Sequence, residues 1–206
     1  MSQPSRRLVV YIDGESHFVR SEKAWCKIHS ECESLDAITT RHESGPPLLL
    51  DQRCKVFWSR IFSPGAHRVV YFSAFSGDSV NLHEVRKSIR DFGLEPNIYH
   101  EPGDLRKHRN NALKNGGLIE KAKQVDIGLT VRALQDAHAD VFDECHIYTS
   151  DVDFIPLIHA LKARGPMVRV FGYDNGLGNL SEFETIPDQF IDLTEIIAEQ
   201  FVVRGL

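Results

Sequence analysis

The sequence predicts an α/β protein in which helices cover both faces of one parallel β-sheet. Short apolar runs, of the kind found in strands buried on both faces, alternate along the chain with longer segments of helical spacing. Strands separated by helical segments indicate β-α-β units, and these units pair their strands in parallel. With 206 residues and 42% hydrophobic content the chain can build one proper core. We therefore expect a single domain spanning residues 1–206.

Five apolar runs predict strands. They span residues 8–12, 69–72, 96–100, 145–149 and 168–172. Helices are predicted at residues 81–92, 125–139, 154–163 and 191–201. The first of these helices has Leu82, Val85 and Ile89 on one face and stops at Gly93, a residue suited to a helix end. Residues 25–61 fit neither pattern, and we expect an irregular insertion between the first and second strands.

Right-handed crossovers restrict the topology of such a sheet to a few arrangements. We expect a Rossmann-like order, 3-2-1-4-5, in which the winding direction reverses between the first and fourth strands. Open parallel sheets bind their ligands outside the carboxyl ends of the strands at such a reversal. The fold prediction therefore also predicts where a site should lie.

Charge is unevenly distributed along the chain. The formal net charge of −5 argues against a generic polyanion binder. Residues 106–123 nevertheless contain six lysines and arginines against a single acid, Glu120, whereas residues 182–199 are acidic. The basic stretch can hold phosphates by displacing their counterions, or it can be an ordinary solvated surface.

The apolar runs are all too short to span a membrane, and the polar N-terminus shows no secretory signal. Four scattered cysteines do not form a disulfide framework, so we expect a reducing, cytoplasmic location. Three of them, Cys26, Cys32 and Cys54, lie near His29 and His42. Zinc needs about four well-placed ligands, and packing on a helix face explains this spacing more simply.

Acidic residues follow two of the predicted strands. Asp13 comes directly after the first strand, and Asp151 and Asp153 follow the fourth. With the expected strand order, these acids face each other across the reversal point. Converging carboxylates repel one another and raise their pKa values unless a cation neutralises them, and Mg²⁺ or Mn²⁺ suits oxygen ligands and keeps open positions for phosphates. Such an ion activates water for hydrolysis of a phosphodiester.

Each acid also has a simpler interpretation. Asp13, before Gly14, is a common turn former. Asp151 or Asp153 can cap the following helix through a side-chain oxygen. The combination of all three is more specific than any one of them.

Several short motifs, taken in order, resemble one known family. Val10 to Gly14 is similar to the opening strand of NYN domains, a branch of the PIN-like nucleases. Lys123 to Leu129 resembles the second signature of that family, and Thr149 to Leu157 the third, usually written S-G-D-x-D-F. Gly165 to Val170 and Asp188 to Leu193 continue the pattern. The resemblance covers nearly the whole chain, with residues 25–61 matching worst.

The resemblance implies a PIN-like fold and a metal-dependent endoribonuclease that hydrolyses RNA by metal-activated water. It adds Asp126 to Asp13, Asp151 and Asp153 as an acidic catalytic site. The ion, Mg²⁺ or Mn²⁺, would be held by Asp13, Asp151 and Asp153. The RNA backbone would be positioned by Arg106, Lys107, Arg109, Lys121 and Lys123. The RNA target and the oligomeric state, a homodimer included, stay open.

The chain departs from the family pattern at two places. Glu15-Ser16 stands where the family often has an asparagine, and Ser150 replaces the customary glycine. Neither change removes a carboxylate, but both favour a second hypothesis, a weak or inactive PIN-like module that binds nucleic acid or a regulatory protein. A phosphatase of the haloacid dehalogenase type is a third, and it would require the Asp151-x-Asp153 motif on the first strand.

Overall fold

The computed structural model describes residues 6–14, 16–17, 20, 65–76, 79–91, 93–101, 122–173 and 180–194. Within these ranges the elements are, in order, β1 (Leu8–Asp13), β2 (Ala66–Ser76), α4 (Ser79–Asp91), β3 (Glu95–Glu101), α6 (Ala122–His138), β4 (Glu144–Tyr148), the 3-10 helix η2 (Val152–Phe154), α7 (Ile155–Arg164), β5 (Met167–Gly172), α8 (Leu180–Thr185) and β6 (Gln189–Asp192). The irregular insertion expected at residues 25–61 lies outside the described residues.

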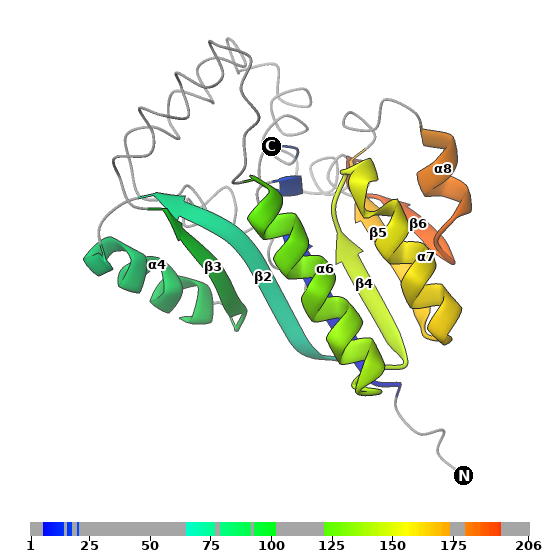
Figure 1. Ribbon diagram of the computed structural model, residues 1–206, viewed down its shortest axis with the longest axis horizontal. Coiled ribbons are helices and arrows are strands. Elements are labelled where there is room, and N and C mark those ends of the chain that lie inside the picture. The colour runs from blue at the N-terminus through cyan, green and yellow to red at the C-terminus, as the bar shows by residue number, and fades with distance from the viewer. Residues whose placement is uncertain are drawn as a thin grey trace, which may run out of the picture.

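The described strands form one sheet in the order β3-β2-β1-β4-β5-β6. Every neighbouring pair is parallel, so all six carboxyl ends lie along one edge, toward the top of Figure 1. The predicted order 3-2-1-4-5 is confirmed, and β6 extends it by one strand. The winding direction reverses between β1 and β4, where the sequence placed it.

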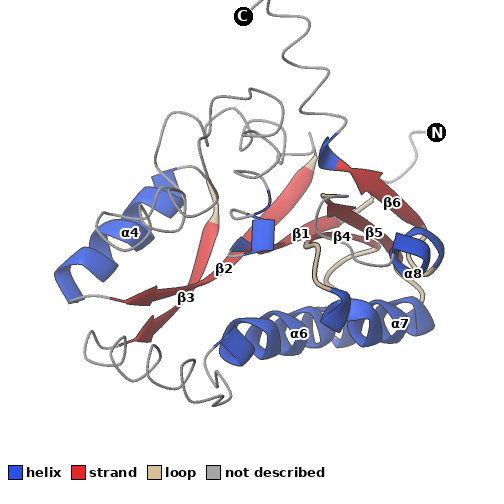
Figure 2. Cartoon of the chain, turned by 90° about the horizontal axis from the view of Figure 1, so that it is seen from above, coloured by secondary structure: helices blue, strands red, loops and turns tan. Residues whose placement is uncertain are grey.

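Both faces of the sheet are covered, as Figure 2 shows with α4 on one side and α6 and α7 on the other. Alternate residues of β1 point to opposite faces: Val9 and Tyr11 pack in the core under α6 and α7, whereas Val10 and Ile12 pack in the core under α4. This is why β1 is apolar from Leu8 to Ile12 and buried along nearly its whole length.

Three predicted helices are confirmed with small changes at their ends. Helix α7 ends at Arg164, and the next residue, Gly165, has a φ of 109°, in the left-handed region that glycine tolerates. The separate 3-10 helix η2 directly precedes α7. The prediction of a helix from residue 191 is wrong at its start, because residues 191 and 192 belong to β6. Helix α8 has no counterpart among the predicted helices.

No helix in the described ranges is long and apolar enough to cross a lipid bilayer.

Candidate functional site

The centre of the carboxyl edge is the junction of β1 and β4. These strands pair from Leu8↔Glu144 to Ile12↔Tyr148, so the next residues along, Asp13 and Thr149, emerge side by side. Adjacent strands lie about 4.8 Å apart. The structure therefore brings Asp13 next to the turn that carries Asp151, on the same side of the molecule.

Thr149 joins the two halves of this junction. Its hydroxyl donates to Asp13 Oδ2 at 2.9 Å and accepts from the backbone N–H of Asp151 at 3.1 Å. The side chain is only 1% exposed, so both bonds are shielded from water. One buried hydroxyl thus fixes the distance between the end of β1 and the Asp151 turn.

Asp13 is held from a second direction by its own chain. Its Oδ1 accepts the backbone N–H of Ser16 at 3.2 Å, as a residue at a helix N-cap does. Gly14 allows the chain to pass close to β2 here, because a Cβ at that position would lie 2.6 Å from the Phe72 carbonyl oxygen and closer still to the Tyr71 ring. The simpler interpretation of Asp13 as a local structure former is therefore true, and it orients a carboxylate that is only 3% exposed.

Asp151 and Asp153 lie on the turn that leads into α7. Asp151 is the N-cap of η2, and its Oδ1 accepts the N–H of Asp153 at 2.9 Å. The capping interpretation is thus correct for Asp151, whereas the Asp153 side chain is exposed to solvent. Within the described ranges no lysine or arginine pairs with either carboxylate.

The fourth predicted acid, Asp126, lies near the start of α6 and is half-buried. This end of α6 sits close to β3: a Cβ at Gly128 would lie 1.6 Å from the Tyr99 hydroxyl oxygen. Because α6 runs antiparallel to the strands, its N-terminal end lies at the carboxyl edge, toward the top of Figure 1. Asp126 therefore belongs to the same edge of the molecule as the other three acids.

His17 lies four residues after Asp13 and brings no positive charge to the junction of β1 and β4. The ring is buried against Tyr148 and Tyr173, with ring centroids 5.7 and 5.6 Å away. Burial lowers the pKa of His17 to about 3, because a charged imidazolium would lose its hydration there. His17 is neutral at physiological pH and does not offset the negative charge of Asp13.

The donor chemistry of the junction fits a hard divalent cation. Asp13 and Asp151 offer only oxygen atoms from neighbouring strand ends, and Mg²⁺ keeps several waters and needs only one or two protein carboxylates. Among the described residues, no three histidine, cysteine, aspartate or glutamate side chains gather closely enough to hold an ion by themselves. The expectation that Asp13, Asp151 and Asp153 share one ion therefore stays a prediction.

The five predicted RNA-binding cations are not placed by the structure. Arg106, Lys107, Arg109 and Lys121 lie outside the described ranges, as do the cysteines considered for zinc, and Lys123 is described only as part of the α6 backbone.

Sequence reasoning missed the hydroxyl groups of the junction. The sequence predicts no role in the site for Thr149, and it marks Ser16 and Ser150 only as departures from the NYN family pattern. The signal was present as a Thr-Ser-Asp run directly after a buried strand. A further acid, Asp192, ends β6 on the same edge, but two strand spacings, about 10 Å, separate β6 from β4. We therefore keep Asp192 apart from the junction.

Comparisons with known proteins agree with this architecture. The family profile described as the NYN domain matches residues 7–194. The chain is similar to the crystal structure of a protein of unknown function from Vibrio parahaemolyticus RIMD 2210633, with a TM-score of 0.54, 15% identity and coverage of 94% of this chain and 96% of that one. At that identity the likeness concerns the fold alone. A search of the curated proteins found no match.

Proposed function

The chain belongs to the NYN domain family, and from this membership and the geometry at the ends of β1 and β4 we propose that it is a metal-dependent endoribonuclease. The family has a PIN-like nuclease fold, and its members generally act on nucleic acid with divalent metals. For this chain the proposal specifies RNA as the substrate, cleavage at internal positions, and Mg²⁺ or Mn²⁺ as the ion.

One observation carries the proposal. Thr149 binds Asp13 and the Asp151 turn with a single buried hydroxyl, at 2.9 and 3.1 Å. This contact joins the Asp13 carboxylate to the backbone of Asp151, so two acidic residues are tied together at neighbouring strand ends. A site for a cation gains a ligand set that is already in position before the ion binds.

Asp13 and Asp151 would hold the ion, and their roles follow from how they are oriented. Asp13 is buried, and hydrogen bonds from Thr149 and Ser16 hold its carboxylate in one orientation. Asp151 uses Oδ1 to cap η2, which aims the rest of its carboxylate. When bound, the ion would activate a water for in-line attack and offset the charge that develops on phosphate oxygens.

Asp153 and Asp126 would complete the acidic site. Asp153 is exposed at the rim, where it could reach the ion through a water or orient the substrate. The cations predicted to bind RNA, Arg106, Lys107, Arg109, Lys121 and Lys123, remain part of the proposal, because a chain of net charge −5 needs a local basic stretch to hold a polyanion.

Cleavage of an end-labelled single-stranded RNA with Mn²⁺, and with Mn²⁺ removed by a chelator, tests this function. We expect internal cuts by the native protein and at least a ~10²-fold slower rate for Asp151→Asn, because a ligand charge is lost. Asp140→Asn is the matched control. It makes the same chemical change at a position with φ of 51°, which asparagine tolerates well.

Two other outcomes would replace the proposal. RNA binding without cleavage at any Mn²⁺ concentration would favour the non-catalytic PIN-like module. Cleavage that continues unchanged in Asp151→Asn would place the chemistry elsewhere in the chain.

A further inference from the structure

We propose that Ser16 and Ser150 are positioning residues that hold the Asp151 turn in its metal-binding geometry, an inference that rests on the proposed function. They are the two described positions where the chain departs from the NYN pattern, and in the folded protein they contact each other. The structure thus links two changes that are far apart in the sequence.

The first contact ties the turn to the β1 side. Ser16 Oγ accepts the backbone N–H of Ser150 at 3.2 Å, while the backbone N–H of Ser16 donates to Asp13 Oδ1 at the same distance. A single residue therefore touches both the Asp13 carboxylate and the peptide that precedes Asp151. Movement of the turn away from β1 would break this contact.

The second contact ties the turn to the β5 side. Ser150 Oγ accepts the backbone N–H of Tyr173 at 2.8 Å and lies 3.5 Å from the Tyr173 carbonyl oxygen. A glycine at position 150 could make neither contact. Ser150 is 4% exposed, so water does not readily replace these bonds.

Close approach at Gly172 makes this contact possible. A Cβ there would lie 2.8 Å from the Thr149 carbonyl oxygen and 3.2 Å from Ser150 Oγ. The end of β5 therefore packs directly against the residues that precede Asp151, with no side chain between them.

Together these hydroxyls hold the ends of β1, β4 and β5 to one another. Residue 150 is fixed from both sides, by its N–H toward Ser16 and by its Oγ toward Tyr173. Asp151, the next residue, starts from a fixed peptide, so less motion has to be frozen when an ion binds. Supporting hydrogen bonds around metal ligands typically change metal affinity 10- to 100-fold.

The test is the dissociation constant for Mn²⁺ itself, measured by electron paramagnetic resonance on the full chain without RNA. We expect Ser16→Ala and Ser150→Ala each to weaken Mn²⁺ binding roughly tenfold. Ser16→Thr keeps the Oγ acceptor and should restore native affinity. Ser88→Ala on α4, far from the carboxyl edge, is the matched control and should bind as the native protein does.

A merely structural role gives a different result. In that case the alanine variants would melt at a lower temperature without metal, yet those that remain folded would bind Mn²⁺ with native affinity, and the inference would be wrong. Gly172→Ala tests the same turn without touching either serine, because its new methyl group would push on Thr149 and Ser150. Native Mn²⁺ affinity in folded Gly172→Ala would likewise count against the inference.

The two proposals fail in distinguishable ways. If the native protein binds no Mn²⁺, the proposed function fails and this inference fails with it. If the native protein binds Mn²⁺ and Ser150→Ala binds it equally well, only the positioning role is lost.

Discussion

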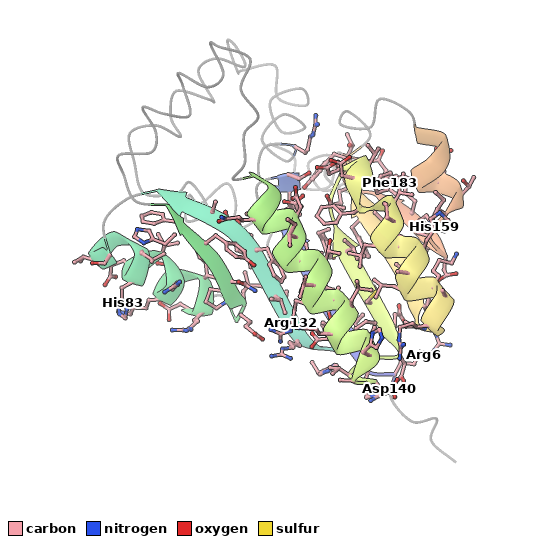
Figure 3. All side chains as sticks on the ribbon, in the orientation of Figure 1. Arg6, His83, Arg132, Asp140, His159 and Phe183 are labelled. Carbon is pink, nitrogen blue, oxygen red and sulfur yellow. The ribbon has the colours of Figure 1, made fainter. Side chains whose placement is uncertain are left out.

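The two edges of the sheet stabilise their charged side chains in opposite ways. At the amino edge, where the parallel strands begin, acidic side chains pair with arginines. The pairs are Arg7–Asp143 at 2.7 Å, Arg68–Glu95 at 2.6 Å, Arg132–Asp136 at 2.9 Å and Arg169–Glu144 at 3.0 Å. Figure 3 shows Arg6, Arg132 and Asp140 gathered at this lower end of the molecule.

At the carboxyl edge, the hydrogen bonds described for the acids come from neutral groups. Asp13 accepts from a hydroxyl and a backbone amide, and Asp151 accepts from a backbone amide. Neutral donors orient a carboxylate without cancelling its charge, whereas an arginine does both. Ion pairs therefore hold the acids of the amino edge, whereas the hydrogen bonds described at the carboxyl edge orient Asp13 and Asp151.

Among the changes that compare the two edges, the largest expected effect comes from the Thr149 hydroxyl, which joins β1 to the Asp151 turn. Thr149→Val has nearly the same shape but leaves Asp13 and the Asp151 amide without this partner, so we expect RNA cleavage to fall about 10- to 100-fold. Thr149→Ser keeps the hydroxyl and serves as the matched control. Equal turnover by the valine and serine variants would show that the hydroxyl does not organise the site.

A change at the amino edge should affect stability but not metal binding. Asp136 accepts from both Tyr11 and Arg132 at 2.9 Å, so Asp136→Ala strands two donors and should lower the free energy of unfolding by about 2–3 kcal/mol. Tyr11→Phe removes one donor and should cost only about 1 kcal/mol. Urea denaturation gives both values. Weaker Mn²⁺ binding by folded Asp136→Ala would contradict the separation of the two edges.

Two glycines distinguish backbone crowding from side-chain crowding. Gly128→Ala should cost about 1–3 kcal/mol, because its Cβ would meet the end of the Tyr99 side chain, and adding Tyr99→Leu should recover part of the loss. Gly14→Ala meets the Phe72 carbonyl oxygen as well as Tyr71, so Tyr71→Leu should not restore it. Thermal melts of the four variants decide whether these contacts act as described.

The smallest expected effect is a pH dependence from His17. The pKa of His17 falls from its ordinary 6.5 to about 3 on folding, because the ring is buried. Between these values the unfolded chain binds the extra proton, so stability falls as pH is lowered. His17 should account for about 1 kcal/mol between pH 6.5 and 5.5, measured as the difference in urea stability between the native protein and His17→Gln. An identical pH profile in both proteins would mean that folding does not lower the pKa of His17.

Much of the fold could be predicted because the signals are local. β1 is apolar from Leu8 to Ile12, and α4 places Leu82, Val85 and Ile89 on one face, so either element can be predicted without knowing its neighbours. β6 has only four residues and exists because it pairs with β5, through contacts such as Phe171↔Ile191. A strand defined by its partner cannot be identified from its own residues.

The same distinction separates the acids from the groups that orient them. Asp13 and Asp151 could be identified from the sequence because Asp13 ends β1 and Asp151 comes soon after β4, and strand order alone places them at one edge. The role of Ser150 depends on Tyr173, and that of Ser16 on Ser150, contacts that only the folded chain creates. From the sequence the two serines look like departures that weaken the site, whereas in the folded chain they form the hydrogen bonds on which the proposed positioning role rests.

The position of a bound ion tests the central claim most directly. Crystals soaked with Mn²⁺ and measured at the manganese absorption edge should show an anomalous peak within ligand distance of Asp13 or Asp151, on the carboxyl side of Thr149. The same soak of Asp13→Asn should weaken that peak. A strong peak elsewhere, or none at saturating Mn²⁺, would contradict the assignment of this junction as a metal site.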